Sequence, residues 1–318
     1  MNFSETTFNS PPPEKIKLTP DLLEKSHDKL NGMTAEMVTE MKNDVFAGKK
    51  LIDPEGHIKM SMFDDVFSKE ELAGDKEHLY RKKRLWSGYG IDGRMIEWKK
   101  RGLIEENEIV AQYEKDRKKN KPALLESATT ILFYKITKDR FLVVKTSEWD
   151  DLENSADNII IDKATGEIVG MFDEVDEKVT GEVKDRGEKK DKQVKIIEKA
   201  LKGGSNIKYG LTFATNASGE KKIVKKSFAN IPIFYLSLEL ENLGDLVESV
   251  GGKLSDKVSD KGLQFFDEFI KSLEGQAVLL QEKLLQANYQ GGGKAVDRNI
   301  ENFKKSLAVM KDLRNKYA

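Results

Sequence analysis

Short β-type runs and amphipathic helices alternate between Pro122 and about Ala214, and this alternation constrains the fold more than any other feature of the chain. Apolar residues recur at helical spacing from Pro122 to Thr137, and a proline suits the first turn of a helix. Runs rich in isoleucine, valine and phenylalanine predict the strands that follow. The expected elements, in order, are a helix at Pro122–Thr137, strands at Phe141–Val144, Asn158–Ile161 and Ile168–Val175, a helix at Gln193–Leu201 and a strand at Ile207–Ala214.

The segment Asp162–Gly166 is typical of a turn, so the strands on either side of it are predicted to form a hairpin. Two further runs, Lys222–Lys226 and Ile231–Leu238, also indicate strands, and Leu243–Val250 indicates a short helix. We therefore predict an α/β fold in which a mixed central sheet is flanked by helices, with helical extensions at both ends of the chain.

Helical patterns flank this module on both sides. Thr19 is a candidate cap for one helix and Thr34 for a second, and Ser68 with Glu71 forms a capping-box pattern. After the module, two long apolar-striped segments separated by Gly291–Gly293 predict a helical hairpin. The expected regions are a disordered arm at 1–18, a helical region at 19–120, the α/β core at 121–250 and the helical hairpin at 251–318.

Composition excludes several classes of function. The chain has no cysteine, so disulfides and thiolate metal sites are ruled out, and its three histidines lack the spacing of a zinc site. Charged residues make up 34% of the chain but the net charge is −1, which is not the balance of a generally basic nucleic-acid binder. Because no apolar run is long enough for a membrane span or a signal peptide, we expect a cytoplasmic protein without a membrane partner.

Four carboxylates collect at one end of the predicted hairpin. Asp157 opens the first strand, and Asp173, Glu174 and Asp176 close the second. In an antiparallel hairpin these ends are adjacent, and alternation places Glu174 and Asp176 on one face of the sheet and Asp173 on the other. Like charges gathered in this way favour a bound cation, and Mg²⁺ or Mn²⁺ prefers carboxylate oxygens. The competing interpretation is a solvated hairpin end.

The order of elements and these acidic residues resemble the PD-(D/E)XK nuclease superfamily, whose core is restriction-endonuclease-like. In that family a helix glutamate, an acidic residue early in the second strand and an acidic-x-Lys element in the third strand surround a metal ion. The matching positions here are Glu126, Asp157 and Glu174–Val175–Asp176. The resemblance covers Pro122 to about Ala214 and implies metal-assisted hydrolysis of phosphodiester bonds.

This chain departs from the family at Asp176, which stands where the family usually has lysine. Lys208 and Lys178 are the candidate replacements, and an inactive site is the alternative. A register shifted by one residue would make Asp173 a metal ligand in place of Glu174. The expected site residues are therefore Glu126, Asp157, Glu174, Asp176 and Lys208, with Asp157, Glu174 and Asp173 as metal ligands.

Two basic stretches near tryptophans are candidates for contact with a phosphate backbone. The first precedes Trp86 and the second follows Trp98, and a solvated helix face with the tryptophans in the core is the competing interpretation of each. Their basic residues are Arg81, Lys82, Lys83, Arg84, Lys99, Lys100 and Arg101.

Three hypotheses about function follow from these patterns. The first is a Mg²⁺- or Mn²⁺-dependent nuclease that acts on DNA. The second is a catalytically degenerate nuclease fold that binds nucleic acid or protein. The third is an interaction protein whose C-terminal helices bind a partner or a second copy of the chain.

Overall fold

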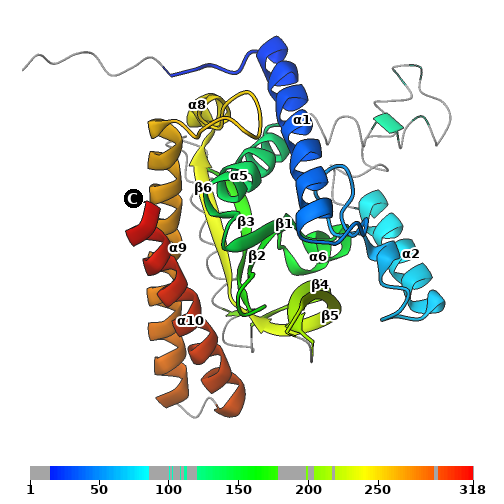
Figure 1. Ribbon diagram of the computed structural model, residues 1–318, viewed down its shortest axis with the longest axis vertical. Coiled ribbons are helices and arrows are strands. Elements are labelled where there is room, and N and C mark those ends of the chain that lie inside the picture. The colour runs from blue at the N-terminus through cyan, green and yellow to red at the C-terminus, as the bar shows by residue number, and fades with distance from the viewer. Residues whose placement is uncertain are drawn as a thin grey trace, which may run out of the picture.

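A four-stranded mixed sheet lies at the centre of the protein and a two-stranded sheet lies beside it (Figure 1). The computed structural model describes residues 15–85, 100, 102, 108, 111–112, 120–177, 198–199, 204–216, 219–289 and 293–317. The strands of the central sheet, in spatial order, are β1 (Phe141–Lys145), β2 (Asn158–Asp162), β3 (Ile168–Glu177) and β6 (Ile233–Glu239). The smaller sheet pairs β4 (Ser205–Thr215) with β5 (Lys221–Ile231). The predicted α/β class with a mixed sheet is confirmed.

The pairing within the central sheet fixes which side chains are neighbours. Strands β1 and β2 run antiparallel, as do β2 and β3, so the predicted hairpin is confirmed. Strand β6 lies parallel to β3. Lys145 stands opposite Asn158, which in turn stands opposite Phe172. Because laterally paired residues share a face of the sheet, these three side chains form one row.

The fourth strand of the central sheet is not the next strand along the chain. The strand expected at Ile207–Ala214 forms as β4, but it pairs with β5 outside that sheet. Strand β6 takes the fourth place instead, parallel to β3. Its residues are almost all buried, because helix α9 packs against this edge strand, whereas β4 is partly exposed and β5 mostly exposed.

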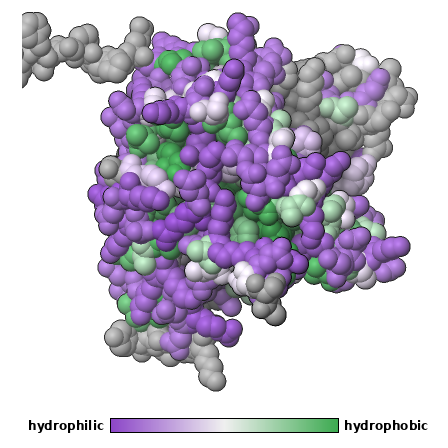
Figure 2. All heavy atoms as spheres, viewed as in Figure 1, coloured by the Kyte–Doolittle hydropathy of each residue, from purple (hydrophilic) through white to green (hydrophobic). Residues whose placement is uncertain are grey.

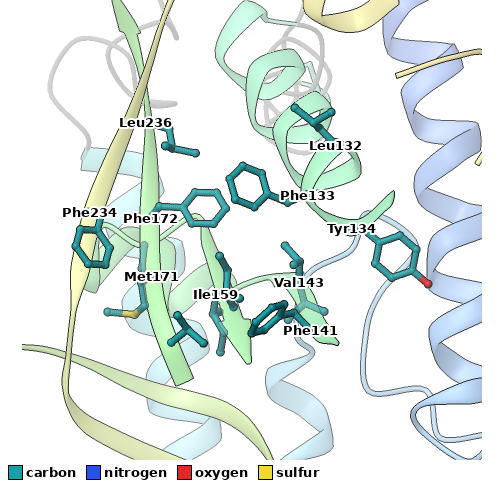
Figure 3. Packing of buried hydrophobic residues seen from close by; sticks show 14 of the residues in the cluster. Leu132, Phe133, Tyr134, Phe141, Val143, Ile159, Met171, Phe172, Phe234 and Leu236 are labelled. Atoms are coloured by element: carbon teal, nitrogen blue, oxygen red, sulfur yellow. The ribbon is translucent and has the colours of Figure 1, made fainter. Parts of the chain in front are cut away.

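Helix α5 (Lys121–Thr137) packs on the sheet and carries the expected helix of the module. Asn120 caps it by accepting a hydrogen bond from the backbone of Ala123, and Pro122 lies in its first turn. Its Phe133 ring points toward Phe172 of β3, with 5.2 Å between ring centroids (Figure 3). The position of α5 over the sheet therefore rests on buried aromatic packing.

Helix α1 (Pro20–Asp44) lies against α5 and is one continuous helix. The expectation of a second helix capped by Thr34 was wrong. The Thr34 hydroxyl donates to the backbone carbonyl of Leu30 one turn earlier, so it is satisfied inside the helix. Met33, Met37 and Met41 are buried on the same side and carry the apolar stripe through this point.

The remaining short elements frame the sheet. They are the 3₁₀ turns η1 (Met60–Met62) and η2 (Leu240–Asn242) and the helices α2 (Lys69–Leu85), α6 (Glu148–Asn154) and α8 (Leu243–Ser249). The capping box before α2 is confirmed, because the Ser68 and Glu71 side chains bond each other's backbone amides. Helix α6 was not predicted, and it begins where the Ser147 hydroxyl accepts a bond from the Asp150 amide.

Helices α9 (Asp260–Tyr289) and α10 (Gly293–Tyr317) form the predicted hairpin, and α9 runs beside β6 (Figure 1). Phe266 of α9 packs edge-on against Phe133, with 5.0 Å between centroids. The hairpin is therefore part of the main core. Within the described ranges, no helix combines the length and apolar character needed to cross a membrane.

Two predicted segments fall largely outside the described residues. The predicted helix Gln193–Leu201 is described only at Glu198 and Lys199, which are helical. Of the expected arm at 1–18, residues 1–14 lie outside the description. The backbone amide of Ile16 donates to Asp245 at 3.2 Å, which places this part of the chain against α8.

Candidate active site

Asp157 and Glu174 meet at one end of the β2–β3 hairpin. Asp157 directly precedes β2, and its backbone amide donates to the Phe172 carbonyl at 3.1 Å. Its Oδ2 accepts a hydrogen bond of 2.8 Å from the Glu174 amide. The Asp157 carboxylate is thus tied to the backbone of Glu174, 17 positions later in the sequence, and the two side chains are also in contact.

The Glu174 carboxylate is held from the side of α5. Its Oε1 accepts a 2.8 Å bond from Asn158 Nδ2, and Asn158 Oδ1 accepts a 2.8 Å bond from the Thr130 hydroxyl of α5. The other oxygen, Glu174 Oε2, is buried and has no hydrogen-bond partner among the residues that the structure describes. One acceptor of this buried carboxylate therefore remains available to a ligand.

Burial and mutual repulsion raise the pKa of both carboxyls well above their ordinary values. For Asp157 the largest cause is desolvation, followed by the charges of Asp173 and Glu174 and, more weakly, Asp151 and Glu126. For Glu174 desolvation again leads, the contact with Asp157 and the charge of Lys145 lower its pKa, and Glu126 and Asp173 raise it. The structure thus brings Glu126, Asp157, Asp173 and Glu174 within electrostatic reach of one another.

Glu126, Asp157, Asp173 and Glu174 together form what we call the acidic corner. Lys145, which the sequence patterns did not single out, supplies a cation to this corner. It ends β1 and is only 5% exposed. Its Nζ lies 3.1 Å from Glu126 Oε1 and donates to the Ser127 hydroxyl at 3.1 Å. The available signal was a lysine that closes the apolar run Phe141–Val144, since a buried strand rarely carries an unpaired charge.

A cavity of about 290 Å³ opens beside Glu126 and Lys145. Its walls come from α1, from the turn at residues 53–57, from the start of α5 and from the region where β1 leads into α6. The lining residues that bear ionisable groups are His27, Glu55, His57, Glu126, Lys145 and Glu148. The N-terminal region therefore forms one wall of the candidate site, a role that its sequence pattern did not indicate.

The predicted lysine replacement lies in a different part of the fold. Lys208 belongs to β4, where its ammonium pairs with Asp75 and stands 5.2–5.8 Å from the ring centroids of Phe67, Trp149 and Tyr209. Asp176 lies in β3 opposite Leu238, but its side chain is not among those described. Lys178 falls wholly outside the described residues.

The first basic stretch lies on α2 and is engaged in contacts within the chain. Arg81 pairs with Glu77, Lys82 with Glu153, Lys83 with Glu148 at 3.1 Å, and the Arg84 guanidinium donates to the Tyr80 hydroxyl at 2.9 Å. Of the second stretch, Lys100 is helical and exposed, whereas Lys99 and Arg101 lie outside the described residues.

Two further findings bear on the identity of the site. In the described part of the chain, no three histidine or carboxylate side chains stand in an arrangement that could hold a metal ion as they are. No protein-family model, curated protein or solved structure matches this chain. The case for function therefore rests on the geometry and chemistry of the corner itself.

Proposed function

We propose that the protein is a metal-dependent nuclease that hydrolyses phosphodiester bonds, with DNA as its substrate. The observation that carries this proposal is the meeting of Asp157, Glu174 and Glu126 beside the buried ammonium of Lys145. The order of helix and strands up to the third strand, with acidic residues at Glu126, Asp157 and Glu174, agrees with the resemblance to the PD-(D/E)XK superfamily.

The donors at this corner fit Mg²⁺ or Mn²⁺ in their chemistry. Asp157 and Glu174 would hold the ion, with Asp173 as an alternative ligand, because hard cations prefer carboxylate oxygens. The buried Glu174 Oε2 without a described partner supports this fit. A bound ion of this kind polarises a phosphate and lowers the pKa of a water. Binding requires the carboxylates to approach one another more closely than they stand.

Lys145 takes the place of the lysine that the motif lacks at Asp176. Its ammonium is fixed by Glu126 and Ser127 at the edge of the cavity, and it shares a face of the sheet with Asn158, the partner of Glu174. A preorganised cation in a site of low dielectric stabilises the negative charge that develops on a phosphate under attack. The ion pair with Glu126 orients the lysine for this role.

The second candidate function is a nuclease-like fold that binds nucleic acid without cutting it. The observation in its favour is that, over the described residues, the carboxylates do not stand ready to hold a metal. This candidate predicts salt-sensitive DNA binding that needs neither Mg²⁺ nor Asp157. Cleavage assays separate it from the first candidate directly.

A second copy of the chain is the proposed protein partner of the C-terminal helices. Leu263, Val278, Leu279 and Leu285 of α9 are exposed by 37–45%, although the face seen in Figure 2 is mainly hydrophilic with separated hydrophobic areas. Deleting the hairpin is a poor test, because Phe266 packs on Phe133. Leu279→Lys tests the idea without opening the core, with molecular mass by light scattering as the measurement.

The nuclease proposal is tested by incubating the full chain with supercoiled and single-stranded DNA and with RNA, with Mg²⁺, with Mn²⁺ and with a chelator. We expect metal-dependent cleavage that Asp157→Asn and Glu174→Gln each abolish. Glu167→Gln is the matched control, because this exposed carboxylate pairs with Lys305 at the opposite end of the hairpin. Cleavage that survives both site variants, or no cleavage of any substrate, overturns the proposal.

A further inference from the structure

His57 shares a face of the central sheet with the charged corner. The backbone of residues 56–58 pairs with the free edge of β1, through bonds from the Ile58 amide to the Lys145 carbonyl and from the Lys145 amide to the Gly56 carbonyl, both of 3.2 Å. His57 is therefore the parallel bridge partner of Lys145. Because lateral partners point to the same side, His57 continues the row formed by Lys145 and Asn158.

The turn before His57 is built to hold this position. Asp53 Oδ1 accepts bonds of 2.9 Å from the backbone amides of both Glu55 and His57. Gly56 adopts a φ of +91°, which a glycine tolerates and other residues rarely adopt. The Asp53 side chain and the glycine thus lock the short segment against the sheet edge.

The hydrogen bonds of the imidazole define its tautomer. Nδ1 lies 3.0 Å from the backbone carbonyl of Thr146, and a carbonyl oxygen can only accept, so Nδ1 carries a proton. In the neutral ring the basic lone pair is then on Nε2. For Nε2 the structure shows no hydrogen-bond partner among the residues it describes, and the ring lines the cavity together with Glu126 and Lys145.

We propose that His57 is the proton acceptor of the hydrolysis, an inference that rests on the proposed nuclease function. As the oxygen of the attacking water bonds to phosphorus, Nε2 takes one proton from that water. The bond between phosphorus and the leaving sugar oxygen breaks, and this oxygen takes a proton from solvent water. The imidazolium then returns its proton to solvent, so atoms and charge balance over the cycle.

The charged surroundings of His57 are set by several elements. The groups that face it around the cavity are His27 from α1, Asp53 and Glu55 from its own turn, Glu126 from α5, Lys145 from β1 and Glu148 from α6. This set holds four carboxylates and one lysine. The carbonyl of Thr146 orients the ring, as the third group of an activated base does.

The test compares His57→Gln with His27→Gln in the full chain. Glutamine at position 57 can still donate to the Thr146 carbonyl but cannot accept a proton, and His27 lines the same cavity with its Nε2 near the Asn120 carbonyl. We measure kcat and KM for metal-dependent DNA cleavage across pH, after thermal unfolding has shown that both variants fold.

We expect His57→Gln to lower kcat about 10²–10⁴-fold with little change in KM, because the group that takes the proton of the attacking water is lost. Added imidazole should restore part of the rate to His57→Ala. A substrate with a good leaving group should not rescue His57→Gln, because the missing step concerns the attacking water.

The outcomes distinguish a failure of the role proposed for His57 from a failure of the proposed nuclease function. If His57→Gln keeps its kcat while Asp157→Asn is inactive, the role of His57 is overturned and the nuclease function stands. A rise in KM shared equally by His57→Gln and His27→Gln also overturns the role, since it indicates only a cavity wall. No cleavage by the unmodified chain overturns the nuclease function and the role of His57 together.

Discussion

The ammonium of Lys145 lies 3.1 Å from a carboxylate oxygen of Glu126, although the two residues come from different elements, β1 and α5. The lysine side chain is 7% exposed and the glutamate side chain 21% exposed. This pair joins the helix that covers the sheet to the strand that borders the cavity. It is therefore at once a structural contact and the best-placed source of positive charge at the candidate site.

Replacing Lys145 by methionine should abolish cleavage and lower the free energy of unfolding by about 1–3 kcal/mol, because the partly buried Glu126 loses its ion pair with Lys145. Adding Glu126→Gln should recover most of the stability, since no unpaired carboxylate then remains, but none of the activity. Urea unfolding and cleavage assays on Lys145→Met, on Glu126→Gln and on the double variant form a double-mutant cycle. Additive losses of stability would show that the pair is not coupled.

Glu174→Gln should stabilise the metal-free protein at neutral pH by about 0.5–2 kcal/mol. Burial first, and then neighbouring carboxylates, raise the pKa of Glu174 well above its ordinary value of 4.5. A carboxyl with a raised pKa binds its proton more tightly when folded, so the native state loses stability as pH rises from the ordinary value through the raised one.

The gain in stability from Glu174→Gln should therefore vanish at a pH below the ordinary pKa, where Glu174 is protonated in both the folded and the unfolded state. Glutamine keeps the acceptor that Asn158 uses. Thermal unfolding across pH, with and without Mn²⁺, measures both effects, and Mn²⁺ should stabilise only the unmodified chain. A variant that is less stable at neutral pH would show that burial and neighbouring carboxylates do not make the ionised form of Glu174 unfavourable.

Lys208→Met should leave cleavage unchanged while it lowers stability by about 1–2 kcal/mol. The ammonium that is lost pairs with Asp75 and stands near the rings of Phe67, Trp149 and Tyr209, none of which is an expected site residue. Its comparison with Lys145→Met decides which lysine serves the site. A specific loss of kcat in Lys208→Met would return the catalytic role to the lysine that the motif suggested.

Gly166→Ala should destabilise the protein by more than 2 kcal/mol, whereas Gly219→Ala should cost about 1 kcal/mol. Both glycines have positive φ, +75° and +82°, so both substitutions strain the backbone. Only at Gly166 would a Cβ also meet a neighbour, the Phe213 carbonyl oxygen at 2.2 Å. Equal losses of unfolding free energy would mean that β4 does not press on the β2–β3 turn.

Arg81→Gln and Arg84→Gln should each weaken DNA binding and reduce its logarithmic dependence on salt by about one unit. The ion pair of Arg81 with Glu77 is exposed, so it contributes little to stability and can yield to a phosphate. Lys25→Gln on α1, which breaks an equivalent exposed pair with Asp21, is the control. An unchanged salt slope in the arginine variants would exclude α2 from the DNA-binding surface.

Local signals in the sequence were sufficient for the hairpin and for most helices. The turn Asp162–Gly166 lies between two apolar runs, and the caps at Thr19 and Ser68 act through neighbouring backbone amides. Such interactions span only a few residues, so a single sequence reveals them. The adjacency of Asp157 and Glu174 follows from the same hairpin.

Interactions between distant segments could not be predicted from these local signals. Whether β4 or β6 lies beside β3 depends on burial against helices that come later in the chain, and both runs are compatible with a strand. Lys145 and His57 become neighbours only because a turn 88 residues away bonds to the edge of β1, a pairing with no local signature. The segment around His57 showed no sequence pattern that would connect it with Asp157 and Glu174.

The parallel pairing of β3 with β6 has a consequence for synthesis of the protein on the ribosome. Glu174 lies opposite Leu236, so the strand that carries it gains its second neighbour only after the chain has been made beyond residue 239. Pairings between distant segments form late because the intervening loop must first be closed. A nascent chain that stops before β6 would expose Asp157 and Glu174 to water and lack the burial that raises their pKa. The site around Asp157 and Glu174 is therefore assembled only after just over three quarters of the chain has been made.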